Sequence, residues 1–301
     1  MKQAKPTVLV IGSSNTDFVV ACPRLPRPGE TLLGGEFRQF HGGKGANQAV
    51  AAARAGAGAR TIFIGACGRD DLGRAALAAL RREKIDVRRV VLRADLPSGI
   101  ALILVGGKSR ENLIAVARSA NDSLSTADVL AARPAFAKAR VILSQLEIPL
   151  EAVTAAARLA REQNLPFLLN PSPVRAIPAA LFRFIDTIIP NQHEAALLTK
   201  ETDPVRAGRQ FLKKGCRRAV ITLGAEGALL VDGEGHRHFP APKVKPVDTV
   251  GAGDCFAGWL ATGIAEGLPL AETIGRAVRA ASLSTTRSGA QPSFPRRAEI
   301  G

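Results

Sequence analysis

The sequence contains the stretch Asp248-Thr249-Val250-Gly251-Ala252-Gly253-Asp254, which runs directly into the apolar segment Cys255–Ala265. Small residues at 251–253 allow a tight turn at the start of a helix, where bare backbone N–H groups can hold an anion such as a phosphoryl group in transfer. Asp254 falls in the first helical turn, where it could accept a proton from an attacking hydroxyl. An ordinary glycine turn with a capping aspartate would look the same, so the motif alone leaves both interpretations open.

A second glycine-rich loop opens a helix nearer the N-terminus: Gly42-Gly43-Lys44-Gly45-Ala46-Asn47-Gln48-Ala49. Lys44 and Asn47 could hydrogen-bond a polar ligand that approaches the backbone closely at the glycines. The loop is not a P-loop, because no Gly-Lys-[Ser/Thr] stands at the required spacing. A GxGxxG fingerprint with its acidic partner is also missing, which disfavours a nicotinamide enzyme.

Between these loops, short apolar runs alternate with alanine-rich helical stretches. The predicted strands are Thr7–Ile11, Thr61–Ala66, Val141–Ser144, Pro166–Leu169, Thr187–Ile189 and Ala219–Thr222. The predicted helices include Ala46–Ala57, Leu72–Glu83, Leu150–Gln163 and Val205–Lys214. Unalternating apolar strands separated by helices indicate a parallel sheet covered on both faces. We therefore predict an α/β fold, a doubly wound αβα sandwich, as a single domain over residues 1–301.

Two stretches interrupt this order with segments typical of antiparallel strands. Residues 17–40 combine several prolines with two short strand-like runs, and residues 98–117 read as a hairpin with a turn at Gly106-Gly107-Lys108-Ser109. We expect both stretches to form a small β-sheet lid over a site at the strand ends.

The composition excludes several classes of protein. The chain is strongly basic, with 41 Lys+Arg against 26 Asp+Glu and a net charge of +15. The basic residues are scattered in pairs, aromatic residues make up only 4%, and tyrosine is absent, so a base-stacking nucleic-acid platform is poorly supplied. We expect the basic surface to attract anionic substrates such as ATP and no specific nucleic acid.

Neither export nor membrane insertion is expected. The apolar run at Val8–Ile11 is too short for a signal peptide core, and no run of about eighteen apolar residues occurs. The four cysteines, at positions 22, 67, 216 and 255, show no metal-binding spacing and are expected to be reduced thiols in the cytoplasm.

With these two glycine-rich loops at this spacing in the sequence, the chain resembles the PfkB-type carbohydrate kinase family over essentially its whole length. The matching segments, in chain order, are Gly12–Asp17, Gly43–Asn47, Gln145–Glu147, Pro190–Glu194, Thr222–Gly227, Asp248–Asp254 and Thr286–Ser293. The resemblance implies the predicted sandwich with its lid. It also implies transfer of the γ-phosphoryl group of ATP to the 5-hydroxyl of D-ribose, giving D-ribose 5-phosphate.

The resemblance also assigns roles to individual residues. Asp254 matches the catalytic base, and Gly251, Ala252 and Gly253 match the anion hole. The substrate-binding set is implied to be Asn15, Asp17, Gly43, Lys44, Gly45, Ala46, Asn47 and Glu147, together with Asp254. Carboxylates there are chemically apt, because they accept hydrogen bonds from sugar hydroxyls.

The nucleotide and the metal ions are assigned in the same way. The resemblance implies nucleotide contacts from Asn191, Thr222, Leu223, Gly224, Ala225, Glu226, Gly227, Gly253 and Val278. Glu194, in an NxxE motif with Asn191, matches an element that organises Mg²⁺ through water. An activating K⁺ would be held, mostly by backbone carbonyls, at Asp248, Val250, Ser284, Arg287, Gly289 and Ser293.

Three alternatives remain beside a ribose kinase that forms a homodimer through its lid sheet. The chain could phosphorylate 2-deoxyribose or another sugar, or it could phosphorylate a nucleoside, because the sequence does not show how much room lies beyond the sugar. It could also be a sugar-binding regulator without activity, although an intact Asp254 and its loop argue against that.

Overall fold

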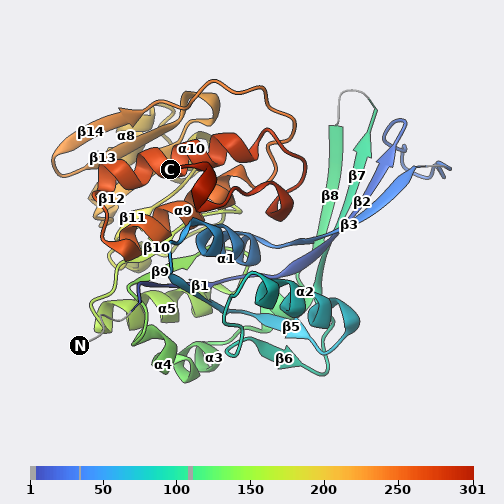
Figure 1. The fold of residues 1–301 in the computed structure, drawn as a ribbon, viewed down its shortest axis with the longest axis horizontal. Helices are drawn as coiled ribbons and strands as arrows, with labels where there is room; N and C mark the ends of the chain where they lie inside the picture. The colour runs from blue at the N-terminus through green and yellow to red at the C-terminus, as the bar shows by residue number, and fades with distance from the viewer. Residues whose placement is uncertain (1–4, 34, 108–110) are drawn as a thin grey trace.

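The computed structural model describes residues 5–33, 35–107 and 111–301. Its main sheet has eight strands in the order β14-β13-β12-β11-β10-β9-β1-β4 (Figure 1). Six of them run parallel: β1 (Thr7–Ile11), β4 (Arg60–Ile64), β9 (Val141–Ser144), β10 (Phe167–Leu169), β11 (Thr187–Ile188) and β12 (Arg218–Thr222). Two antiparallel strands extend one edge, β13 (Ala228–Asp232) and β14 (Gly235–Phe239).

Both faces of the parallel part of this sheet are buried, as its apolar strands require. In β1, Val8 and Val10 join one hydrophobic core, whereas Leu9 and Ile11 join the other. The first core packs under α1 (Lys44–Ala55), α2 (Asp71–Arg82), α9 (Ala252–Glu266) and α10 (Leu270–Ser284). The second packs under α3 (Thr126–Ala131), α4 (Arg133–Phe136), α5 (Leu150–Glu162), α6 (Ala179–Phe182), α7 (Gln192–Thr199) and α8 (Pro204–Lys214). The predicted doubly wound αβα sandwich is confirmed.

A second sheet stands off the main layer at one end of the molecule (Figure 1). Its order is β3-β2-β7-β8, from β2 (Asn15–Cys22), β3 (Glu36–Gly42), β7 (Gly99–Gly106) and β8 (Glu111–Ala117). These strands come from the two stretches predicted to form the lid. Residues 108 and 109 of the predicted hairpin turn lie outside the described residues, as do residues 1–4.

One pairing in this sheet differs from the expected antiparallel pattern. Strands β2 and β7 run parallel, with Asn15 opposite Gly99 and Asp17 opposite Ala101. The chain leaves β2, makes β3, enters the main layer through α1 and returns in β7, so β2 and β7 are joined by a long crossover and not by a hairpin. A two-stranded parallel pair, β5 (Ala66–Gly68) and β6 (Val91–Arg93), forms part of this crossover.

The predicted helices and strands have the observed bounds to within a few residues. Helices α3, α4, α6, α7 and α10 and strands β5, β6, β13 and β14 were not predicted. Among the residues that the structure describes, no helix is both long and apolar enough to cross a membrane.

Candidate active site

Polar side chains gather where the parallel strands β9 to β12 end, next to the start of α9. A cavity of about 210 Å³ lies there, lined by Lys44, Asn170, Ser172, Ile189, Asn191, Glu194, Thr222, Gly251, Gly253 and Asp254. In open α/β sheets ligands bind outside the carboxyl ends of the strands, so this is the expected place for a substrate site. The cavity brings together residues from both glycine-rich loops, which are about two hundred positions apart in the sequence.

Asp254 lies in the first turn of α9 and is only 6% exposed. Its Oδ2 accepts a hydrogen bond from Asn47 Nδ2 at 3.0 Å, and its Oδ1 accepts one from Gln48 Nε2 at 2.9 Å. Burial raises the pKa of Asp254, and the charge of Lys44 and the two amide donors oppose that rise. A buried carboxylate held by neutral donors can take up a proton without losing its position.

The turn before Asp254 has the backbone that its sequence predicts. Gly251 has φ +78°, and a Cβ added there would meet the Ala290 side chain at 2.8 Å, so only glycine fits. Gly253 differs, because a Cβ added there would have no heavy atom within 4 Å. The cavity that Gly251 and Gly253 line therefore stays open at the start of α9, where helix N–H groups can bind an anion, although the N–H of Ala252 donates to the Thr249 carbonyl at 3.3 Å.

The side of the site that the sequence predicts to bind the sugar, called here the sugar side, is formed by β2, the start of α1 and the loop after β9. Asp17 packs so closely on Gly42 that a Cβ added to Gly42 would lie 2.1 Å from the Asp17 carboxylate. Burial, and then repulsion by Glu147 and Asp254, raises the pKa of Asp17 to about 6. The Asp17 carboxylate is therefore close to Glu147 and Asp254, and no hydrogen bond from a described residue contributes to its pKa.

Glu147 connects the sugar side to α1. One of its carboxylate oxygens accepts hydrogen bonds from Ser13 Oγ at 2.5 Å and from the backbone N–H of Lys44 at 3.0 Å. Ser13 also receives the backbone N–H of Gly45, and its carbonyl receives that of Ala46. Gly43 begins α1 with φ +84°.

Lys44 is the positive charge among these carboxylates. Burial disfavours its charged form, but the carboxylates of Asp254, Glu147 and Glu194 outweigh burial and raise the pKa of Lys44. Asn15 is 5% exposed, and its Oδ1 accepts a hydrogen bond from Asn121 Nδ2 at 2.8 Å. This bond leaves the amide group of Asn15 free to donate.

The NxxE motif begins helix α7 as a capping box. Asn191 Oδ1 accepts the backbone N–H of Glu194 at 2.8 Å, and Glu194 Oε2 accepts that of Asn191 at 2.9 Å. Both residues line the cavity, and Glu194 is 8% exposed. The described residues contain no cluster of three or more His, Cys, Asp or Glu side chains suited to a metal ion. This donor set fits a Mg²⁺ held mainly by phosphates and water, and does not fit an all-protein cage.

Other residues assigned to the nucleotide lie farther along the same edge. Thr222 lines the cavity, and Gly224–Glu226 form a 3₁₀ turn that Leu223 and Gly227 close with a hydrogen bond of 2.8 Å. Val278, a residue of α10, is 4% exposed and packs into the hydrophobic core. Its contact with a base stays a prediction.

The residues assigned to K⁺ join two loops next to the anion-binding turn. The Asp248 carboxylate accepts the backbone N–H groups of Val250 at 3.0 Å and Gly289 at 2.8 Å. The carbonyls of Asp248, Val250, Arg287 and Gly289 receive no hydrogen bond from a described residue. The Arg287 side chain forms an ion pair with Glu299. Free carbonyls fit a large monovalent cation, whereas the Ser284 carbonyl already accepts the Arg287 N–H at 3.2 Å, and Ser293 is fully buried.

Several buried amides around Asp254 were not predicted to take part in the site: Gln48, Asn121, Gln145, Asn170 and Gln291. Gln48, Gln145 and Gln291 lie inside segments already singled out, so they could have been considered. Asn170 follows directly after the predicted strand Pro166–Leu169, a position at which polar residues commonly reach a ligand in parallel sheets. Nothing local distinguishes Asn121.

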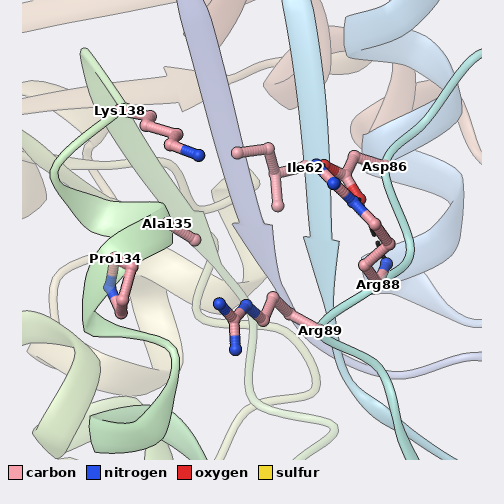
Figure 2. A pocket seen from close by; sticks show the side chains of 7 residues that line it. All are labelled: Ile62, Asp86, Arg88, Arg89, Pro134, Ala135 and Lys138. Atoms are coloured by element: carbon pink, nitrogen blue, oxygen red, sulfur yellow. Dashed lines mark hydrogen bonds and ion pairs between the residues drawn. The ribbon is translucent and has the colours of Figure 1, made fainter.

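A different cavity, of about 150 Å³, lies beside β4 and is shown in Figure 2. Its lining includes Arg88, Arg89 and Lys138, and Arg88 pairs with Asp86. A neighbouring cavity includes Thr7 and Arg60, the first residues of β1 and β4. Both are therefore near the amino ends of the strands, and neither contains a residue predicted for the site.

Comparison with known proteins decides the family. The family model described as "pfkB family carbohydrate kinase" matches residues 5–297. The chain belongs to this family. The PfkB kinase assignment from the two glycine-rich loops is therefore confirmed, and with it the assignment as a sugar kinase.

Individual relatives of this PfkB kinase cover nearly its full length. It is 38% identical to the ribokinase of Haemophilus influenzae, over 98% of this chain and 97% of that protein. The structure of Thermotoga maritima ribokinase is similar with a TM-score of 0.89 and 33% identity, covering 98% of this chain and 97% of that one. Arabidopsis thaliana ribokinase, solved in complex with ribose and ATP, is similar with a TM-score of 0.90 and 29% identity, with the same coverage.

Proposed function

We propose that this PfkB kinase transfers the γ-phosphoryl group of ATP to the 5-hydroxyl of D-ribose. The observation that carries the proposal is the position of Asp254. It lies between the carboxylates of the sugar side and the open helix start that suits a phosphoryl group. Relatives of matching length that are named ribokinases support ribose as the acceptor.

In the reaction, Asp254 takes the proton of the ribose 5-hydroxyl while the oxygen of that hydroxyl attacks the γ-phosphorus of ATP. A new O–P bond forms, and the bond between that phosphorus and the leaving oxygen of ADP breaks. The backbone N–H groups at 251–253 stabilise the charge on the transferring group. Catalysis of this kind depends mainly on positioning and electrostatics, which a rigid turn at the start of a helix supplies.

Ribose would be held by the groups at the lid-side end of the site. Asp17 and Glu147 accept hydrogen bonds from its hydroxyls, Asn15 and Asn47 donate amide N–H groups, and Lys44 balances the charge of Glu147. The backbone at Gly43, Gly45 and Ala46 fixes the start of α1 so that these side chains converge. Binding the hydroxyls at Asp17 would also relieve the cost of its poorly solvated charge.

ATP and the metal ions would occupy the other end. Thr222 and the turn at 223–227 would support the nucleotide, with Gly253 at its phosphates and Val278 near its base. Mg²⁺ neutralises phosphate charge when bound, and Asn191 and Glu194 would orient its waters. K⁺ would be held by the free carbonyls of the 248–250 and 287–289 loops, where it stiffens the anion-binding turn.

The cellular setting is part of the proposal. All four cysteines are free, which suits a reducing cytoplasm. The lid sheet exposes apolar side chains, including Phe37, Leu102 and Leu113, which supports a homodimer formed through that sheet.

The test is an assay of ADP release with ribose, 2-deoxyribose, other pentoses and hexoses, and adenosine as acceptors. We expect kcat/KM to be highest for ribose. A site that hydrogen-bonds a hydroxyl can reject the deoxy analogue by up to about 10⁴–10⁵-fold, and we expect less here because the 2-hydroxyl does not react. Equal kcat/KM for ribose and 2-deoxyribose, or a preference for adenosine, would contradict ribose as the substrate.

A further inference from the structure

Behind Asp254 lies a chain of buried amide side chains that the family assignment leaves unused. Gln48 is fully buried, and its Nε2 donates to Asp254 Oδ1 at 2.9 Å and to Asn170 Oδ1 at 3.0 Å. Both hydrogens of that amide are therefore used. Its Oε1 accepts Gln145 Nε2 at 2.6 Å, so each polar atom of Gln48 is paired inside the protein.

The orientation of these amides is fixed by a backbone group. Asn170 Nδ2 donates to the carbonyl of Ile189 at 2.8 Å. A carbonyl can only accept, so the amide nitrogen of Asn170 must face it, and Asn170 Oδ1 must face Gln48. Because Asn170 Oδ1 can only accept, Gln48 must turn its amide nitrogen, Nε2, toward Asn170. The second hydrogen of that Nε2 then points at Asp254.

The second carboxylate oxygen of Asp254 is held independently. Asn47 Nδ2 donates to Asp254 Oδ2 at 3.0 Å, while Asn47 Oδ1 accepts Gln291 Nε2 at 3.0 Å. Asn47 is also expected to contact the sugar, but Gln48 is enclosed in the core and has no route to a substrate. Gln48 can therefore act on the reaction only through Asp254.

We infer that Gln48, oriented by Asn170, is a positioning residue that keeps Asp254 ionised and aimed at the ribose hydroxyl. The inference rests on the proposed role of Asp254 as the base. Burial favours the neutral carboxyl, which could not accept a proton, and Gln48 supplies one of the two donors that stabilise the carboxylate.

Other charges around Asp254 act in both directions. Lys44 of α1 favours the ionised form, and Glu147 after β9 disfavours it. Asp17 of β2 is close enough to feel the charge of Asp254, and Glu194 of α7 acts on Lys44. None of these groups contacts Gln48, so replacing Gln48 leaves them in place. A hydrogen bond to a charged group is worth enough to move a pKa by about one to two units.

The experiment is the pH dependence of kcat for Gln48→Met, measured between pH 5 and 9 at saturating ribose and ATP. Methionine keeps the length of the side chain but donates no hydrogen bond. We expect the acid limb of the profile to move up by about one to two pH units, with kcat recovering toward the wild-type value at high pH. Saturation with ribose separates this limb from the titration of Asp17, which acts on ribose binding.

Three further variants complete the design. Asn170→Leu should move the limb in the same direction by less, because Gln48 keeps its donor but loses its orientation. Thr262→Val, equally buried on α9, should lower thermal stability and leave the limb unchanged. If the methionine variant does not fold, Gln48→Glu replaces it. In Gln48→Glu a second carboxylate faces Asp254, so the acid limb of its kcat profile should lie at a higher pH than that expected for Gln48→Met.

The outcomes separate the inference from the proposed function. An acid limb at the wild-type pH in Gln48→Met, with kcat reduced equally at every pH, would overturn the positioning role and leave Asp254 as the base. Asp254→Asn should lose at least about 10²–10⁴-fold in kcat at every pH. If it retained more than about a tenth of the wild-type kcat, where general-base loss predicts far less, the role of Asp254 as the base would be wrong, and this inference with it.

Discussion

At the scale of single residues, the site places three carboxylates, those of Glu147, Glu194 and Asp254, around Lys44, and Asp17 is close to two of them. The sequence singled out all three, because each stands in a segment shared with the family. It did not reveal their electrostatic cost, which depends on burial and distance and not on residue type. The same is true of Gln48, whose importance lies in one contact with Asp254 across the fold.

Asp17 should make stability depend on pH. Its pKa rises from 3.8 to about 6 on folding, so the folded protein keeps a proton that the unfolded chain loses between about pH 4 and 6. The free energy of unfolding therefore falls across this window as pH rises, by up to about 3 kcal/mol. Asp17→Asn removes this loss, so the variant should be more stable than the wild type above pH 6.

Thermal unfolding at pH 4 and pH 8 checks this expectation. The gain in Tm of Asp17→Asn should be near zero at pH 4 and large at pH 8, while Asp95→Asn, at an exposed position, should change neither. A gain of equal size at both pH values would show that Asp17 is not destabilised by its charge. Asp17→Asn should also raise the KM for ribose.

At the scale of elements, the turn between 248 and 254 and helix α9 were predictable because glycines and an apolar run mark them directly. Helix α10 and strand β14 were missed for physical reasons. Leu270–Ser284 mixes charged, small and apolar residues, because only one side of α10 faces the core. Strand β14 is the edge of the sheet, and four of its five residues are exposed, which removes the apolar signal of a buried strand.

Gly253 offers a test of the anion-binding helix start. A Cβ fits there without contact, and alanine favours a helix, so Gly253→Ala should fold with stability unchanged or raised by up to about 1 kcal/mol. The same Cβ fills the space meant for the phosphoryl group, so kcat should fall by about 10–100-fold. Gly275→Ala on α10, where an added Cβ would make only an ordinary contact with Arg279 Nη1 at 3.8 Å, is the matched control and should keep full kcat. Full activity in Gly253→Ala would contradict the anion hole.

The potassium proposal concerns the two loops that Asp248 joins. The ion would stiffen the turn that presents the 251–253 amides without touching substrate, so it should raise kcat with little effect on the KM for ATP. The measurement is activity during titration with KCl in a Na⁺-free Tris buffer, with tetramethylammonium chloride holding ionic strength constant. A flat response would remove the site and leave the kinase assignment unaffected.

At the scale of the whole molecule, the lid sheet was located by its irregular composition, but its parallel β2–β7 pairing was not visible in the sequence. That pairing depends on a crossover through the main layer. Alternation along the strands gives the sheet two faces: Asp17 and Ala101 share the face toward the site, so Phe18 and Leu102 share the other.

The face away from the site is apolar and exposed. Leu102 is 52% exposed and Leu113 is 51% exposed, and Phe18 stacks on Phe37 with ring centroids 5.9 Å apart. We expect this face to form the dimer. The wild type should measure as a dimer by light scattering, and Leu102→Glu combined with Leu113→Glu should measure as a monomer. Leu130→Glu, equally exposed on α3, should stay dimeric. A monomeric wild type at micromolar concentration would contradict the expectation.

The central claim is that Asp254 is the base of a ribose kinase, and Asp254→Asn tests it most directly. Asparagine keeps the size of the side chain but cannot take the proton, so the variant should fold normally. Its kcat for ADP release with ribose should fall by at least the roughly 10²–10⁴-fold typical of losing a general base. The account would be contradicted if the variant unfolded like the wild type and still retained more than about a tenth of the wild-type kcat, because loss of a general base predicts a much larger decrease.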